Sequence, residues 1–97
     1  YPQEIESLLI AHPELADVAV FGLPDEEFGQ RVVAVVQPAS DSVDEGDLCE
    51  RLNRWCHERM SSVKCPKAFY VEKRLPRKDN GKMYKKPLQE KYRQRYA

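Results

Sequence analysis

Apolar residues that recur every three or four positions predict three helices, each with one apolar face. Their expected bounds are residues 2–11, 44–59 and 84–96. The positions that share a face are Ile5, Leu8 and Leu9 in the first, Leu48, Leu52 and Trp55 in the second, and Leu88, Tyr92 and Tyr96 in the third. Prolines suit the first turns of the outer two helices. Asp44 suits the N-cap of the middle one, where its side chain can accept from an unpaired backbone N–H.

Three short apolar runs predict strands over residues 15–22, 31–38 and 68–71. Turn-forming residues follow the first run, at 22–25. The second run places valines on both of its faces, so it should be covered on both sides. In the third, Phe69 and Val71 share one face and Tyr70 lies on the other.

The resulting order is α-β-β-α-β-α in a single domain of residues 1–97. This order favours an α+β fold, in which a small three-stranded sheet has helices packed on it. The chain has no glycine-rich phosphate loop, no Ser-His-Asp set and no carboxylate pair placed for acid–base work. These parts do not make a free-standing enzyme, because nothing in them forms a substrate pocket.

The formal net charge is zero, but the two signs are separated along the chain. Residues 1–60 carry four basic and thirteen acidic side chains, whereas residues 61–97 carry twelve basic and three acidic ones, which gives −9 and +9. Two interpretations fit. Either the second half faces an anion, or the two halves neutralise each other.

The chain has three cysteines, Cys49, Cys56 and Cys65, and no two have Cys-x-x-Cys spacing. Reduced thiols in a cytoplasmic protein are the simplest interpretation, and no metal site is expected. The first two cysteines fall beside the apolar stripe of the middle helix and are expected in the core. No secretion signal or transmembrane run is present. The chain opens on Tyr1 without a methionine, so we expect it to be a piece of a longer protein.

Residues 76–82, Pro-Arg-Lys-Asp-Asn-Gly-Lys, cannot form the interior of a helix or a strand. Pro76 lacks a backbone N–H, and Gly81 can adopt a positive φ after two turn-forming residues. A tight exposed loop is therefore expected to hold the Lys82 ammonium in a fixed place. It would suit a phosphate or carboxylate that the rest of the chain does not supply. An ordinary solvated loop fits the same residues.

Phe28 is the one aromatic residue in an otherwise acidic loop over residues 24–30. It has two interpretations: an anchor folded into the core, or a stacking surface for a flat ligand. The residues alone favour the anchor.

Several motifs occur in a fixed order and spacing. They are Tyr1-Pro2-x-Glu4-Ile5-Glu6, His12-Pro13, Asp17-Val18-Ala19-Val20-x-Gly22-x-Pro24-Asp25-x-x-x-Gly29, Lys64-x-Pro66 and Leu75-Pro76-x-x-x-x-Gly81-Lys82. Together they resemble the small C-terminal lid domain of adenylate-forming enzymes, which include acyl-CoA synthetases, non-ribosomal peptide adenylation domains and luciferases. The sequence around residues 64–66 and 80–85 is most similar to bacterial acyl-CoA synthetases of the fatty-acid type.

The resemblance implies an acid–thiol ligase that uses ATP and coenzyme A as substrates. A carboxylic acid, of the fatty acyl kind, attacks the α-phosphorus of ATP to give an acyl-adenylate and pyrophosphate, and coenzyme A then displaces AMP. This domain would be a lid with two orientations over a large N-terminal domain, its main partner. That domain would hold the nucleotide pocket and Mg²⁺, so the isolated chain is expected to be inactive.

The resemblance also assigns residues. In the first orientation Lys82 would contact the α-phosphate and the carboxylate, on a loop shaped by Pro76 and Gly81. The same pattern resembles a target of lysine acetyltransferases, and acetylation would remove the Lys82 charge.

In the second orientation, the resemblance implies that Phe28 stacks on the adenine of coenzyme A. Val63 and Lys64 match a segment beside the nucleotide and the coenzyme A channel, where Lys64 would meet a phosphate. Val63 takes a place where some relatives have an aromatic residue.

Two other classes stay open at this stage, a nucleic-acid-binding module and a protein-interaction domain. The basic half interleaves cations with aromatic residues: Lys78, Lys82, Lys85, Lys86, Lys91, Arg93 and Arg95 with Tyr84, Tyr92 and Tyr96. Against nucleic acid, the acidic first half cancels the field, and the family resemblance implies no nucleic-acid partner.

Overall fold

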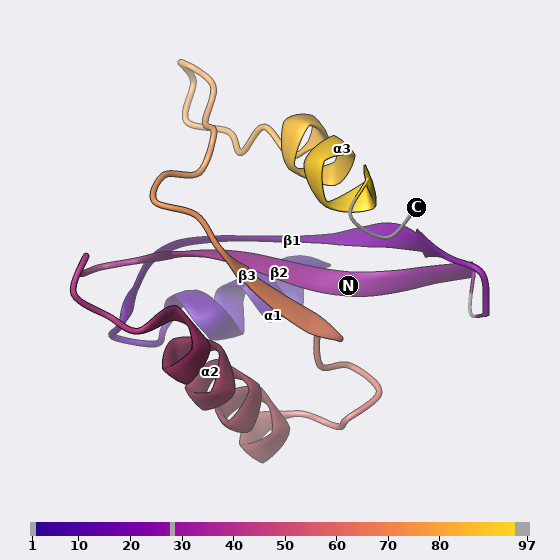
Figure 1. The fold of residues 1–97 in the computed structure, drawn as a ribbon, viewed down its shortest axis with the longest axis horizontal. Helices are drawn as coiled ribbons and strands as arrows, with labels where there is room; N and C mark the ends of the chain where they lie inside the picture. Colours follow the sequence, from indigo (N-terminus) through magenta and orange to yellow (C-terminus); the bar gives the residue numbers. More distant parts are fainter. Residues whose placement is uncertain (1, 28, 95–97) are drawn as a thin grey trace.

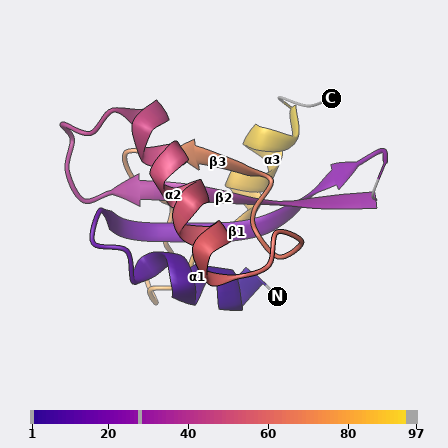
Figure 2. The same cartoon turned by 90° about the horizontal axis from the view of Figure 1, so that it is seen from below.

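A mixed three-stranded sheet organises the domain, in a computed structural model that describes residues 2–27 and 29–94. The helices are α1 (Pro2–Ile10), α2 (Glu45–Arg59) and α3 (Lys86–Gln94), and the strands are β1 (Leu15–Asp25), β2 (Gly29–Pro38) and β3 (Ala68–Val71). The strand order is β1-β2-β3, with β1 antiparallel and β3 parallel to β2. Helices α1 and α2 lie on one face of the sheet and α3 on the other (Figures 1 and 2). This confirms the α+β prediction.

The central strand is buried on both of its faces, as its valines predicted. Ala34 and Val36 join the apolar core beneath α1 and α2, whereas Val33 and Val35 join a second core beneath α3. Phe69 and Val71 of β3 pack on the first core and Tyr70 on the second, as expected. The sheet therefore separates two apolar cores, one on each of its faces.

Strand β1 continues to Asp25, so the turn predicted over residues 22–25 is wrong. Leu23 is buried in the core beneath α3, and Pro24 pairs with Gln30 in the β1–β2 ladder. An edge strand tolerates proline, because one side of its backbone has no partner strand to lose. The connection to β2 is correspondingly short, and β2 begins at Gly29, which has a φ of +78°.

Helix α2 begins as its cap residue predicted. The Asp44 side chain accepts a hydrogen bond from the Asp47 backbone N–H at 3.0 Å. Cys56 lies fully buried in the core beneath α1 and α2, and burial raises the pKa of its thiol to about 11. Cys49 is half-buried, with a pKa raised by burial and by the charge of Glu45. All three cysteines are free thiols.

Helix α3 begins at Lys86, two residues later than predicted. Pro87 lies in its first turn, and the Lys85 carbonyl accepts the first helical hydrogen bond, from Gln89 at 2.9 Å. Leu88 and Tyr92 dock the helix on the sheet, as its stripe predicted. Tyr96 lies outside the described residues. Among the described residues, no helix is both long and apolar enough to cross a bilayer.

Candidate functional site

A small hairpin leads from β3 to α3 and carries Lys82. We call residues 76–84 the lysine hairpin. Its two arms meet in a single antiparallel bridge between Arg77 and Met83, and the Tyr84 backbone N–H donates to the Pro76 carbonyl at 2.9 Å. It projects from the α3 side of the sheet (Figure 1).

The end of the hairpin is a tight turn, as its residues predicted. The Lys78 N–H donates to the Lys82 carbonyl at 2.8 Å, and the Gly81 N–H donates to the Lys78 carbonyl at 2.8 Å. The Lys82 N–H donates to the Asn80 side-chain oxygen at 3.1 Å. Gly81 has a φ of +88°, a backbone conformation that residues with a side chain rarely adopt. Glycine is therefore required there by the turn itself, since the space beside its Cα is open.

The Lys82 side chain is exposed and forms no ion pair with any residue in the described part of the chain. A lysine buried in this domain's own core, or locked in an internal pair, could not reach a second domain. The hairpin instead offers the ammonium to solvent on a turn with defined backbone geometry.

Salt bridges tie the hairpin and the start of α3 to the first half of the chain. The Arg77 guanidinium pairs with the Asp17 carboxylate of β1 at 2.7 Å. Lys85 pairs with Glu6 of α1 at 3.0 Å and donates to the Val20 carbonyl at 2.8 Å. The two oppositely charged halves of the sequence thus neutralise each other in part.

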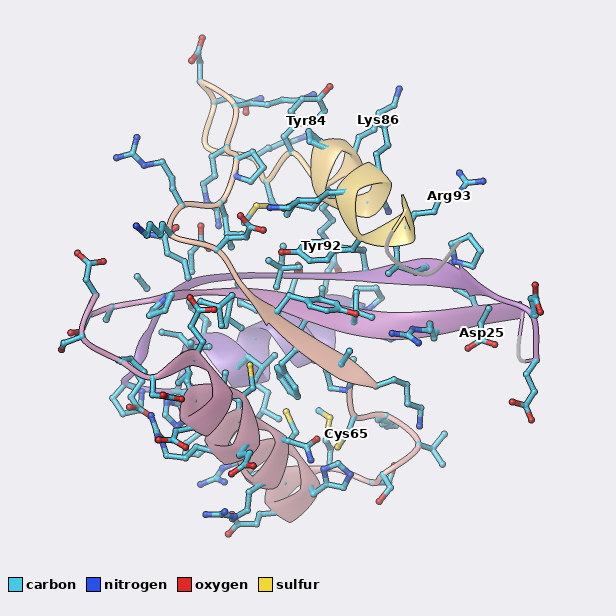
Figure 3. All side chains as sticks on the ribbon, in the orientation of Figure 1. Asp25, Cys65, Tyr84, Lys86, Tyr92 and Arg93 are labelled. Atoms are coloured by element: carbon cyan, nitrogen blue, oxygen red, sulfur yellow. The ribbon has the colours of Figure 1, made fainter. Side chains whose placement is uncertain are left out.

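Other cations of the basic half remain on the surface. Lys78 lies over the Tyr84 ring, with its ammonium 5.0 Å from the ring centre. Tyr84 and Lys86 point away from the sheet, whereas Tyr92 points onto it (Figure 3). Tyr92 stacks on Tyr70 with ring centres 4.3 Å apart, and its hydroxyl donates to the Glu72 carboxylate. Of the two interleaved tyrosines that the structure describes, Tyr92 therefore packs on the sheet and Tyr84 is exposed.

Asp17 is the acidic partner in the hairpin's salt bridge, and its pKa lies below the usual range. Burial alone would raise that pKa, but the hydrogen bonds from Arg77 and from the Val18 N–H, with the Arg77 charge, outweigh burial. A depressed carboxyl pKa adds stability at every pH above the unfolded-state value, about 3.9, and the contribution is lost as the pH falls through the folded-state value.

We therefore expect Asp17→Asn to lower the free energy of urea unfolding of the 97-residue chain at pH 7. The difference from the unmodified chain should shrink between pH 5 and pH 3. Asp41→Asn removes a carboxylate of the same kind from an exposed loop, and it should change stability by no more than about 0.5 kcal/mol. A difference for Asp17→Asn that stays constant across this pH range would contradict the prediction.

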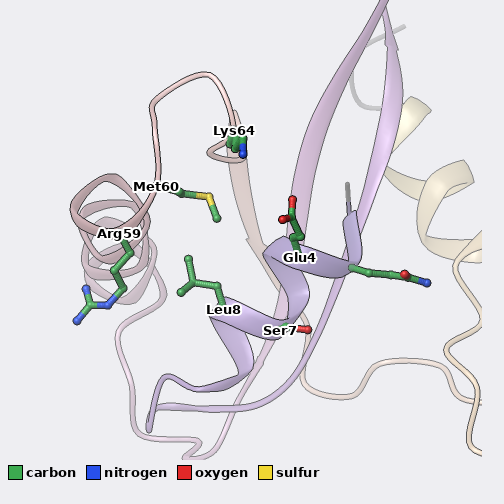
Figure 4. A pocket seen from close by; sticks show the side chains of 7 residues that line it. Glu4, Ser7, Leu8, Arg59, Met60 and Lys64 are labelled. Carbon is green, nitrogen blue, oxygen red and sulfur yellow. The ribbon is translucent and has the colours of Figure 1, made fainter.

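The residues assigned to the second orientation lie on the other side of the sheet. The turn after α2 carries Val63, whose side chain is 87% exposed, and Lys64, which is also exposed. Lys64 borders a hollow of about 570 Å³ between α1 and the end of α2 (Figure 4). Val63 and Lys64 both border an adjoining hollow of about 200 Å³. Phe28 lies outside the described residues, so its two interpretations stay open.

The lysine hairpin and the turn after α2, which carries Val63 and Lys64, thus lie on opposite sides of the sheet (Figures 1 and 2). The structure brings Val63 and Lys64 together and does not bring either near the lysine hairpin. Within the described ranges, no three His, Cys, Asp or Glu side chains gather in a way that could hold a metal ion.

A family model, described as the AMP-binding enzyme C-terminal domain, matches residues 4–82. The chain belongs to this family. The matched region includes the whole sheet and ends at Lys82.

Similar proteins agree with the family. The long-chain-fatty-acid–CoA ligase FadD13 of Mycobacterium tuberculosis is 38% identical over 92 residues, which is 95% of this chain and 18% of that protein. The mitochondrial malonate–CoA ligase ACSF3 of Mus musculus is 41% identical over 86 residues, which is 88% of this chain and 14% of that protein. This chain therefore spans less than a fifth of the length of these relatives.

A solved structure repeats the fold. The ATP-bound RpMatB-BxBclM chimera B1 superimposes with a TM-score of 0.90 at 34% identity, and the match covers 100% of this chain and 19% of that one. The C-terminal-domain fold expected from the motifs is therefore confirmed.

Sequence reasoning missed the contacts that hold the lysine hairpin and the start of α3 to the first half of the chain. Arg77 and Asp17 are 60 residues apart, and Glu6 and Lys85 are 79 residues apart (85 − 6). Opposite charges concentrated in the two halves gave a general signal of attraction. They did not indicate which residues pair, because that depends on how β1 and the hairpin meet in space.

Proposed function

We propose that this chain is the mobile C-terminal domain of an ATP-dependent acyl-CoA synthetase, with an N-terminal domain that holds the nucleotide pocket. Three findings support the proposal. The family model extends to Lys82. The relatives covering most of the chain are named as CoA ligases, and each is more than five times longer than the matched segment. A similar structure was solved with ATP bound, which supports ATP as a substrate.

In the first step, a carboxylate oxygen attacks the α-phosphorus of ATP, the new P–O bond forms the acyl-adenylate, and pyrophosphate leaves. Negative charge is spread over the α-phosphoryl oxygens in the transition state as the carboxylate oxygen attacks, and the bond to pyrophosphate leaves its electron pair on the departing pyrophosphate. Lys82 enters this site and places its ammonium beside the α-phosphate and the carboxylate. A fixed positive charge is most effective in such a place, because closure excludes water and lowers the local dielectric.

The observation that carries this role is the exposure of Lys82. Its ammonium stands on a turn fixed by backbone hydrogen bonds and is exposed to solvent. A group placed in this way costs little to bring into a second domain, since no internal salt bridge has to break. The hydrogen-bonded turn also reduces the backbone freedom that this segment loses on arrival.

In the second step, the coenzyme A sulfur attacks the acyl carbonyl carbon, the thioester forms and AMP leaves. The domain rotates before this step, Lys82 withdraws, and the opposite side of the sheet turns toward the channel. Val63 and Lys64 belong to that side, where Lys64 would meet a phosphate of coenzyme A. Phe28 is proposed to stack on its adenine.

The acid is proposed to be fatty acyl, from the likeness of residues 64–66 and 80–85 to that type of synthetase. The names of the relatives, however, do not agree on one kind of acid. One is named for a long-chain fatty acid and another for malonate, at 38% and 41% identity. Such different acids imply that the acid pocket lies in the N-terminal domain.

Lys82 is also proposed as an acetylation site. Its amine is exposed, as a modifying enzyme requires. An acetyl group would remove the charge that the first step needs, and it would leave the thioester step intact.

The test of the proposed function uses the full-length polypeptide that contains this chain. Supplied with ATP, Mg²⁺, coenzyme A and a panel of carboxylic acids, it should release pyrophosphate and form a thioester with at least one of them. The isolated 97-residue chain should form no adenylate and no thioester, because it lacks the nucleotide pocket. A full-length protein that activates no carboxylic acid, or an isolated chain that does so alone, would refute the proposal.

A further inference from the structure

The lysine hairpin is anchored at its base, where Met83 packs against the core beneath α3, but little fixes the direction of its tip. The five residues of its tip, 78–82, are all exposed, and its arms share one bridge. Two-stranded hairpins without packed neighbours are marginally stable in water. The internal hydrogen bonds define the shape of the turn, but they do not define the direction in which the turn points. A stable presentation of Lys82 therefore needs support from outside the tip.

One end of that support is a hydrogen bond within the hairpin. Arg77 Nη1 donates to the Gly81 carbonyl oxygen at 2.5 Å. The Gly81 carbonyl carbon is bonded to the backbone nitrogen of Lys82. The guanidinium therefore holds the same peptide unit that carries the Lys82 side chain.

The second set of contacts joins Arg77 to Asp17 of the sheet. Arg77 Nε donates to Asp17 Oδ2 at 2.9 Å, and Nη2 donates to Oδ1 at 2.7 Å. The carboxylate is itself fixed, because Oδ1 also accepts from the Val18 backbone N–H at 2.9 Å. Paired N–H···O bonds between a guanidinium and a carboxylate restrain both distance and orientation. A single planar group thus links a strand of the sheet to the tip of the hairpin.

We propose that Arg77 is a positioning residue for Lys82, acting with Asp17 to fix the direction in which the ammonium enters the adenylation site. The proposal rests on the function proposed above. Arg77 does not touch the reacting atoms. It acts by keeping the hairpin in one orientation, and a displacement of about 1 Å at a reacting centre can cost about 100-fold in rate.

The role predicts an effect on one half-reaction only. Lys82 leaves the site before coenzyme A attacks, so the orientation of the hairpin no longer matters in that step. Loss of the Arg77 bridge should therefore slow adenylate formation and leave thioester formation unchanged. A purely structural role would impair both, because both steps need a folded domain.

The test compares matched substitutions in the full-length enzyme. Arg77→Lys keeps the charge but loses the planar fork, which a single ammonium cannot reproduce. It should lower kcat for adenylate formation about tenfold or more, with little change in the KM for ATP and unchanged thioester formation from supplied acyl-adenylate. Asp17→Asn should act in the same direction. Arg74→Lys makes the same change at an exposed position just before the hairpin, and it should leave both half-reactions unchanged.

A double substitution separates positioning from other effects. When Lys82 is already alanine, Arg77→Lys should slow adenylate formation no further, because the group that Arg77 positions is gone. The proposal would be overturned if Arg77→Lys slowed adenylate formation in the Lys82→Ala enzyme as much as it does in the unmodified enzyme. Equal losses of both half-reactions in Arg77→Lys would also overturn it. If Lys82→Ala slows adenylate formation and neither Arg77→Lys nor Asp17→Asn does, the positioning role alone fails. If Lys82→Ala itself has no effect, the proposed function of Lys82 fails.

Discussion

Replacing Lys82 by alanine in the full-length enzyme is expected to slow adenylate formation by about 10²–10³-fold, the usual cost of removing one preorganised group that stabilises transition-state charge. Alanine keeps the backbone of the turn, in which Lys82 uses only its N–H and its carbonyl. The loss should therefore come from the missing ammonium, without a change in the hairpin. ATP-dependent pyrophosphate release, or exchange of labelled pyrophosphate into ATP, measures this step.

The same variant should convert a supplied acyl-adenylate and coenzyme A to thioester at the unmodified rate. Lys78→Ala is the matched control, because it removes an equal charge from the same exposed turn. Lys78 should be dispensable for both half-reactions. Equal loss of both half-reactions in Lys82→Ala, or a Lys78→Ala defect of similar size, would contradict a specific role for Lys82.

Local chemistry was enough to predict those parts of the fold that depend on neighbouring residues. The N-cap at Asp44 and the positive φ at Gly81 each follow from one side chain or from its absence. The valines of β2 predicted burial on both faces because strand side chains alternate. In all three places the sequence already contains the interaction partner, or the pattern that requires it.

Predictions failed where the secondary structure of a residue depends on which segments pair with it in space. Pro24 was expected in a turn, but β1 is an edge strand, and its pairing with β2 carries it through the proline. Strand order cannot be read from a single segment. The start of α3 was placed early for a related reason, since Tyr84 pairs with Pro76 across the hairpin instead of joining the helix.

In the candidate site, too, features that depend on neighbouring residues were predictable and contacts between distant residues were not. The turn that carries Lys82 was predictable, because its proline, glycine and lysine fall within the seven consecutive residues 76–82. The Arg77–Asp17 bridge was not, because its partners are 60 residues apart and meet only when β1 lies beside the hairpin. The sequence also did not indicate that Val63 and Lys64 lie on the side of the sheet opposite Lys82. That separation agrees with a domain that presents one side in each half-reaction.

Leu9→Ala is expected to cost about 2–5 kcal/mol of unfolding free energy, a large part of the stability of a small domain. Leu9 is fully buried beneath α1, in the core that it shares with Val18 and Leu52. The substitution removes apolar contacts and leaves a cavity that the surrounding side chains fill only in part. Urea unfolding of the 97-residue chain, followed by circular dichroism, measures the change.

Ile10→Ala is the matched control, since Ile10 is the next residue on the same helix and is 44% exposed. It should change stability by no more than about 0.5 kcal/mol. In the full-length enzyme, Leu9→Ala should weaken both half-reactions together as the temperature rises, because both sides of the sheet depend on the same folded domain. Equal destabilisation by Leu9→Ala and Ile10→Ala would mean that α1 does not pack as described. Loss confined to adenylate formation in Leu9→Ala would show that selectivity for one step does not identify a positioning residue, which would weaken the test of Arg77.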